Sequence, residues 1–189
     1  EMACFSFYPG KNLGACGEAG GMTTNNEAYY KHLLSLRSHG MTVRYYHDEL
    51  GFNMRMGGLE AGSLSVKLKY LPGWNKRRQD IAKRYLAEIK NDKLRMQAQP
   101  ANVLSVFHLF VITTPDRDGM IKYLNEHNIF PGLHYPVPCH LQKAYTHLGY
   151  KEGDCPNSEY LASHCLSLPM YAELTDEEVD YVIKTINNY

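Results

Sequence analysis

The chain has 189 residues, of which 44% are hydrophobic and 21% are charged, so it can bury a sizeable core in one domain, or in one domain and part of a second. Its formal net charge is zero, and this balance gives no reason to expect a nucleic acid or an anionic membrane as a partner. No apolar run approaches the roughly 20 residues that span a bilayer, so we expect no membrane segment.

The cysteines and histidines argue against a disulfide framework and against a metal centre. The five cysteines are scattered, odd in number and never spaced as C-x-x-C, which is typical of reduced thiols in the cytoplasm. The nine histidines form no H-x-x-x-H pair and no cluster with cysteine. We therefore expect a cytoplasmic protein without a metal site.

The first predicted elements are two short strands and a turn that presents one lysine. The aromatic stretch 5–8 predicts a buried strand, which ends at Pro9-Gly10 and is followed by Lys11. Small residues then dominate positions 14–21, and a second short strand is expected over 21–24.

A helix is predicted next, over 27–40. Asn25 or Asn26 can cap its start, and Gly40 can close its end. Four residues are available for its buried face: Tyr30, Leu33, Leu34 and Leu36.

Two consecutive helices follow. The first has apolar positions at Met56, Leu59, Leu64, Leu68 and Leu71, and Pro72 suits the first turn of a second helix over 73–92. The inner side of the second helix is marked by Trp74, Ile81, Tyr85, Leu86 and Ile89. The segment 67–95 holds ten of the twenty basic residues and only three acids, and we interpret it as a solvated face rather than a phosphate site.

Strands and helices alternate after residue 100, in a layout of the βαβ type. Strands are predicted over 103–112, 129–134 and 167–168, and helices over 114–128, 141–148 and 159–165. Thr175 and Glu178 form a capping box, with Thr175 as the cap of the last helix.

Lys11 is the residue with the most distinctive chemistry. A lone lysine after a strand is usually a solvated turn residue. An amine that is poorly solvated among small residues is more often neutral, and it can then attack carbonyl groups. The chemistry indicated for Lys11 is a Schiff base.

Four motifs in order resemble those of the DegT/DnrJ/EryC1/StrS sugar aminotransferases, which are fold-type-I enzymes dependent on pyridoxal phosphate. They are Ser6-Phe7-Tyr8-Pro9-Gly10-Lys11 with the small residues up to Gly21, the segment Tyr45-Tyr46-His47-Asp48-Glu49-Leu50-Gly51-Phe52-Asn53-Met54-Arg55-Met56, Gly132-Leu133-His134-Tyr135-Pro136-Val137-Pro138, and Leu166-Ser167-Leu168-Pro169-Met170. One departure is Glu60, where relatives commonly have glutamine.

The resemblance implies a cofactor site. In it, Lys11 binds pyridoxal 5'-phosphate covalently and then carries protons, and Ser6 binds the cofactor phosphate. Asn53 reaches that phosphate from the partner subunit, which implies a homodimer with shared active sites. From the residues alone, Ser6 could equally be an ordinary strand serine.

The resemblance also implies a sugar site near Tyr46 and His47, and a substrate loop at His134 and Tyr135. From the residues alone, Tyr46 and His47 could instead belong to an interface. The prolines after Tyr135 could make the segment a rigid connector.

Family members are roughly twice as long, so the resemblance implies an α/β fold that is the C-terminal half of a fold-type-I transferase. The expected parts are the end of the large domain (1–52), linking helices (53–95) and a small α/β domain (96–189). We expect the acid that pairs with the cofactor's pyridine nitrogen to lie in the other half, so that the isolated fragment is inactive.

The implied function is transfer of an amino group, with glutamate as the expected donor, to a keto sugar linked to a nucleotide. Such a reaction serves amino-sugar biosynthesis for polysaccharides or natural products. The alternative is a non-catalytic module that dimerises or binds a partner.

Overall fold

A computed structural model describes all of residues 1–189 and shows a mixed α/β chain. The chain divides into two compact units, Glu1–Pro72 and Gly73–Tyr189, and each unit is described by itself. The expected three-part division at residues 52 and 95 stays a prediction. None of the helices combines the length and the apolar composition that crossing a lipid bilayer requires.

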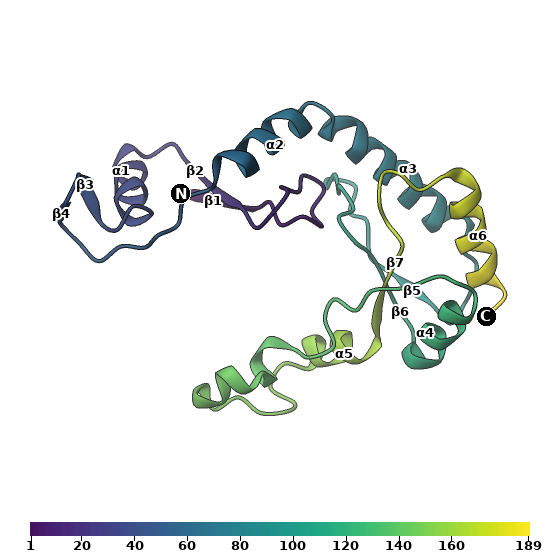
Figure 1. Ribbon diagram of the computed structural model, residues 1–189. Helices are drawn as coiled ribbons and strands as arrows, with labels where there is room; N and C mark the ends of the chain where they lie inside the picture. The colour runs from purple at the N-terminus through teal and green to yellow at the C-terminus, as the bar shows by residue number, and fades with distance from the viewer. The chain divides into compact units, whose positions relative to one another are not determined.

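The first unit contains two small antiparallel hairpins and two helices (Figure 1). Its elements are β1 (Met2–Ser6), β2 (Gly20–Thr24), α1 (Glu27–Leu36), β3 (Met41–Val43), β4 (Tyr46–His47) and α2 (Gly58–Leu68). β1 pairs with β2 so that Met2 lies opposite Thr24 and Ser6 lies opposite Gly20. The connection 7–19 therefore lies at the opposite end of this hairpin from α1, which begins just after β2.

The prediction of a buried first strand is wrong for this unit, because every residue of β1 is exposed. β1 has a single neighbouring strand, and the two-stranded sheet has no third strand. An aromatic sequence predicts a strand that suits burial, but burial itself requires a layer that covers it.

Helix α1 begins where the sequence predicts and ends earlier. The Asn26 side chain accepts hydrogen bonds from the amides of Ala28 and Tyr29, at 2.9 and 3.2 Å. The helix stops at Leu36 rather than near residue 40, because its last carbonyls bond to a returning segment: the Phe52 amide donates to Leu36 at 2.6 Å. The expected buried face is only partly formed: Leu33, Leu34 and Leu36 are half-buried, Tyr30 is exposed, and Ser35 is the only fully buried residue of α1.

The second unit is built around a three-stranded antiparallel sheet in the order β5-β6-β7. This order corrects the expected βαβ layout, which would require parallel strands. Its elements are α3 (Leu71–Glu88, which starts just before the unit), β5 (Arg95–Met96), β6 (Phe110–Thr113), α4 (Arg117–Glu126), two 3₁₀ helices η1 (Cys139–Leu141) and η2 (Lys143–Leu148), α5 (Pro156–His164), β7 (Cys165–Leu168) and α6 (Asp176–Asn187).

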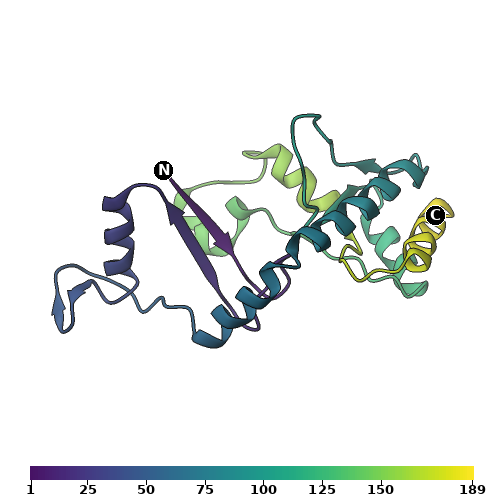
Figure 2. The same cartoon turned by 90° about the horizontal axis from the view of Figure 1, so that it is seen from above.

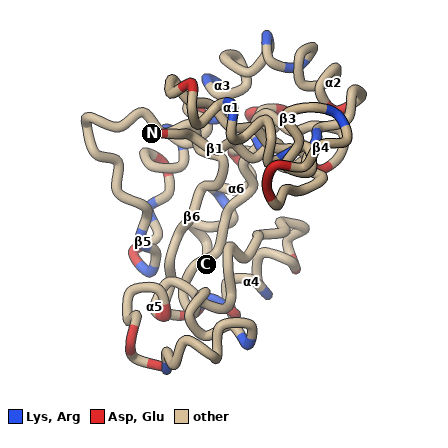
Figure 3. Tube along the Cα trace, turned by 90° about the vertical axis from the view of Figure 1, so that its left-hand side faces the viewer, with Lys and Arg blue, Asp and Glu red and all other residues tan.

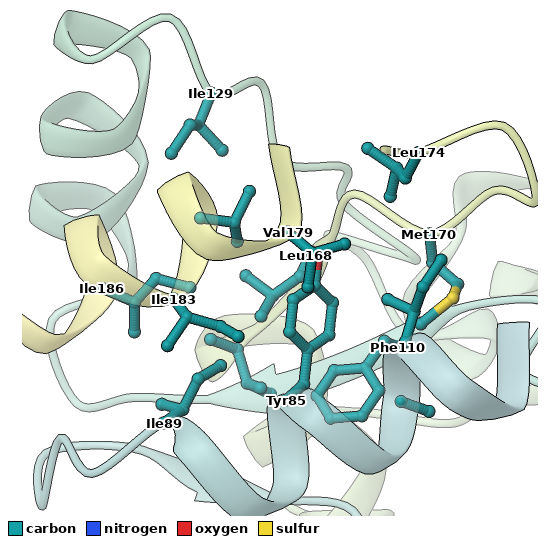
Figure 4. Close-up of a cluster of buried hydrophobic side chains, with 14 of the residues drawn as sticks. Tyr85, Ile89, Phe110, Ile129, Leu168, Met170, Leu174, Val179, Ile183 and Ile186 are labelled. Carbon is teal, nitrogen blue, oxygen red and sulfur yellow. The ribbon is translucent and has the colours of Figure 1, made fainter. Parts of the chain in front are cut away.

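The core of the second unit lies among α3, α4, α6 and the sheet (Figure 4). The Tyr85 ring meets Phe110 edge to face at 5.1 Å, and the Tyr85 hydroxyl donates to the Pro169 carbonyl at 3.0 Å. Ile81 is buried on α3, and Ile89, one residue beyond the end of this helix, is buried in the same core. Thr175 and Glu178 form the predicted capping box at the start of α6.

The predicted strand over 103–112 is wrong except at its end, where β6 begins at Phe110. The backbone before β6 bonds to α3 side chains instead of to another strand. Arg78 donates to the carbonyls of Phe107 and His108, at 3.1 and 3.2 Å, and Gln79 donates to Ser105 at 2.9 Å.

The expected strand over 129–134 is reduced to one isolated bridge between Gly132 and Ser167. The predicted helix over 141–148 consists of 3₁₀ turns, and the predicted helix over 159–165 starts earlier, at Pro156. Most basic residues of 67–95 are exposed or half-buried, as expected. Figure 3 shows basic and acidic positions scattered over the whole chain. Arg84 pairs with Glu88 and Asp180.

Arg78 is the exception among these basic residues, because it is buried and also donates to the Met170 carbonyl at 2.7 Å. We expect Arg78→Met to leave three carbonyls without their donor and to lower the free energy of unfolding by about 2–4 kcal/mol. Lys83→Met, at an exposed position of α3, should change it by less than about 0.5 kcal/mol. Urea unfolding of both variants checks this, and equal midpoints would contradict it.

Candidate active site

The connection between β1 and β2 holds Lys11 in a tight turn. The Lys11 amide donates to the Tyr8 carbonyl at 2.9 Å, which closes the turn across Pro9-Gly10. Two further backbone bonds fold the connection on itself: Phe7 donates to Ala19, and Ala15 donates to Phe7, both at 2.8 Å. Lys11 is half-buried in this connection.

A glycine sets the shape of this connection. A Cβ atom on Gly14 would lie 2.2 Å from the Pro9 carbonyl oxygen, which is too close for any side chain. Gly14 is therefore the residue that lets the chain pass directly beside the turn that carries Lys11. Gly10 is different, because a Cβ atom there would meet the Tyr8 ring only at 3.8 Å.

Helix α2 holds the other side of the connection. The Lys67 ammonium donates to the Gly14 carbonyl at 2.5 Å. A Cβ atom on Gly17 would lie 3.3 Å from Glu60 Oε1, so the Glu60 carboxylate lies beside Gly17. In Figures 1 and 2 the connection lies near α2, whereas α1, β3 and β4 lie toward the other end of the hairpin.

Ser6 is the last residue of β1 and lies at the same end of the hairpin as Lys11. Its side chain is exposed, and its oxygen accepts a hydrogen bond from the Tyr8 amide at 3.4 Å. The hydroxyl is the acceptor in this bond, so its hydrogen remains for donation to another group. The hairpin thus presents one amine and one hydroxyl at one end.

Tyr46, His47 and Asn53 lie in the part of the first unit that follows α1. Tyr46 is 70% exposed, and His47 Nδ1 lies 2.9 Å from the His39 carbonyl oxygen. Asn53 is exposed, and its backbone bridges Ser38 just beyond α1. Within one copy of this unit, these residues are grouped away from the Lys11 end of the hairpin.

His134 and Tyr135 belong to the second unit. His134 Nδ1 lies 2.9 Å from Ser167 Oγ, and its ring covers Gly132, where a Cβ atom would come within 2.5 Å of it. Tyr135 is 70% exposed and contacts the His134 ring edge to face. β7 therefore anchors His134 and leaves Tyr135 facing solvent.

A pair that the sequence did not single out fixes the segment after Tyr135. His140 Nε2 lies 2.9 Å from Glu159 Oε1, and the Glu159 carboxylate also accepts hydrogen bonds from the amides of Gly153 and Cys155. These bonds, with the Gly153 amide as the largest cause, hold the pKa of Glu159 below its usual value.

The sequence did not single out Lys67 either. The spacing of Glu60, Leu64 and Lys67 indicates one face of a helix, but the partner of Lys67 lies 53 residues earlier in the chain. No cluster of three or more His, Cys, Asp or Glu side chains is arranged to hold a metal ion.

Comparison with known proteins relates this chain to one family. The model of the DegT/DnrJ/EryC1/StrS aminotransferase family matches residues 1–187. The dTDP-3-amino-3,6-dideoxy-alpha-D-galactopyranose transaminase of Aneurinibacillus thermoaerophilus is 40% identical over 189 residues, which cover 100% of this chain and 52% of the relative.

Two solved structures have a closely similar fold. DesV of S. venezuelae, in complex with a ketimine intermediate, has a TM-score of 0.95 and 34% identity over 99% of this chain and 51% of its own. NtdA of Bacillus subtilis, with bound cofactor PMP, has a TM-score of 0.89 and 29% identity over 99% and 45%. The chain spans about half the length of the relatives it matches, which agrees with the expected half of a family member.

Gly14 and Gly10 offer a matched test of the connection. We expect Gly14→Ala to force the chain away from Pro9 at a cost of about 1–3 kcal/mol. Hydrogen exchange at the Lys11 and Ala15 amides should then become much faster. Gly10→Ala should leave both amides as protected as before, because its methyl group reaches only ordinary contact distance. Equal protection in the two variants would contradict the role of Gly14.

Proposed function

Because this chain belongs to the DegT/DnrJ/EryC1/StrS aminotransferase family, we propose that it forms part of an enzyme that transfers an amino group to a keto sugar of a nucleotide-sugar, with glutamate as the amino donor. The observation that carries the proposal is the end of the β1–β2 hairpin, where a half-buried lysine follows a tight turn and a serine hydroxyl ends the adjacent strand. The alternative of a non-catalytic module gives no reason for this combination.

The proposed cofactor is pyridoxal 5'-phosphate, and the residues present fit it chemically. The cofactor supplies an aldehyde that binds amines and a ring that withdraws electrons from the substrate carbon. The Lys11 amine can bind the aldehyde, and the Ser6 hydroxyl can donate to a phosphate oxygen. The PMP bound by NtdA, which is the amino form of this cofactor, supports the same choice.

Lys11 has a second proposed role as a base. Its Nζ takes a proton from the substrate carbon that exchanges the amino group and later returns one. This role requires a lysine whose amine can move while its backbone is held in place. The turn that the Lys11 amide closes onto the Tyr8 carbonyl holds the Lys11 backbone in place. The expected acid opposite the pyridine nitrogen is not assigned to any residue of this chain.

The substrate side is proposed for Tyr46, His47, His134 and Tyr135. Exposed aromatic and imidazole groups can stack on a sugar or base and can donate hydrogen bonds. The anchoring of His134 by Ser167 supports a fixed orientation for that ring. These assignments rest on the resemblance of the motifs and on these contacts.

We further propose a homodimer in which Asn53 of one copy completes the Lys11 site of the other. Asn53 and Lys11 lie in different parts of the first unit, so one copy does not supply an obvious common site. The segment around Asn53 also exposes apolar side chains, which is typical of interfaces: Val43, Tyr45, Tyr46, Leu50, Phe52 and Met54. A cytoplasmic location is proposed with it, since all five cysteines are free thiols.

The first test concerns Lys11 in the native full-length protein. Saturation with pyridoxal phosphate, followed by borohydride reduction and peptide mass spectrometry, should place the cofactor on the peptide that contains Lys11. Lys11→Ala should abolish this adduct and lower glutamate-dependent amination by at least about 10³-fold. Lys31→Ala, at an exposed position of α1, is the control and should change neither result. A wild-type protein without an adduct at Lys11 would overturn the proposal.

The second test asks whether sites are shared. Lys11→Ala and Asn53→Ala subunits should each be poorly active. After mixing and reassociation, activity should recover to about a quarter of wild type, because half of the random dimers are mixed and each has one intact site. No recovery in verified mixed dimers would show that Asn53 does not act across the dimer.

A further inference from the structure

The proposed function leaves one face of α2 without a role. Glu60, Leu64 and Lys67 are separated by four and three residues, so their side chains lie on the same face of the helix. Leu64 is buried, and Glu60 and Lys67 are half-buried, whereas most other residues of α2 are exposed. This face is therefore the one that packs against the rest of the first unit.

The connection between β1 and β2 crosses this face. Lys67 donates to the Gly14 carbonyl at 2.5 Å, and the Glu60 carboxylate lies beside Gly17. Gly14 and Ala15 are buried at this crossing. Two groups of opposite charge thus bracket four residues of the connection, one at each end of the same helical face.

The bond from Lys67 continues to the turn that carries Lys11. Gly14 lies directly against Pro9, since a Cβ atom on Gly14 would reach within 2.2 Å of the Pro9 oxygen. Pro9 is the second residue of the turn that the Lys11 amide closes onto the Tyr8 carbonyl. A displacement of Gly14 therefore displaces the turn, because no side chain between them can absorb it.

We propose that α2 acts as a clamp on the 7–19 connection and that Lys67 is a positioning residue for Lys11, acting through the Gly14 carbonyl. The inference rests on the proposed role of Lys11. A charge-assisted hydrogen bond is about twice as strong as a neutral one, so an ammonium group is well suited to hold this carbonyl. Misplacing a reacting amine by about 1 Å can cost roughly 10²-fold in rate, which makes such a clamp useful to catalysis.

The test compares three variants of the native full-length protein. Lys67→Met keeps most of the apolar stem and removes the donor, Lys67→Arg restores a charged donor, and Lys69→Met changes an exposed lysine two residues later. Hydrogen exchange is measured without added cofactor at the amides of Lys11 and Ala15, which are bonded within the connection. Borohydride trapping of pyridoxal phosphate at Lys11 is then measured for the same proteins.

The clamp predicts at least tenfold faster exchange at both amides in Lys67→Met, confined to the 7–19 connection, together with reduced trapping at Lys11. Lys67→Arg should recover both, and Lys69→Met should match wild type. Unchanged exchange in Lys67→Met, or an equal rise over the whole chain, would overturn the clamp. Absence of trapping in the wild type would instead overturn the proposed function, while the exchange data would still decide whether the clamp exists.

Discussion

The close approach of Gly14 to Pro9 is the constraint on which the candidate site depends. Because Gly14 has no side chain, the connection after β1 can double back beside its own turn. Lys11 is thereby placed at the end of a hairpin rather than on a loose loop. The hydrogen bonds from Ala15 to Phe7 and from Lys67 to Gly14 keep that geometry on both sides. An amine that is to react needs a backbone held in this way, because the position of the side-chain nitrogen depends on the position of the backbone that carries it.

In the second unit the corresponding constraint is a buried arginine. Arg78 donates to the carbonyls of Phe107 and His108, which precede β6, and to that of Met170, which follows β7. These carbonyls lie outside the paired strands. The hydrophobic core around Tyr85 packs the capped helix α6 against the sheet. The same unit anchors His134 on β7 through Ser167, so that a candidate substrate group is carried by a packed element.

The sequence predicted the local features with a local cause. Asn26 caps α1, Thr175 caps α6, and Pro9-Gly10 forms a turn, because each of these effects depends on residues within one turn of chain. Predictions failed where distant groups competed for the backbone. The stretch 103–109 has the composition of a strand, yet its carbonyls accept hydrogen bonds from the side chains of Arg78 and Gln79 instead of from a neighbouring strand. Likewise, α1 ends early because Phe52 returns to its last turn.

The sequence alone determined the order of the four motifs, because the motifs are properties of the chain itself. The resemblance of these motifs implied the α/β fold class and indicated Lys11 as the candidate reactive lysine. The tertiary structure decided which partners these residues have. It placed Lys67 on the Gly14 carbonyl and Glu159 on His140, across separations of 53 and 19 residues. It also grouped Tyr46 and Asn53 apart from Lys11 within one copy. Such pairings depend on how separated segments pack together, and no local pattern of residues encodes that packing.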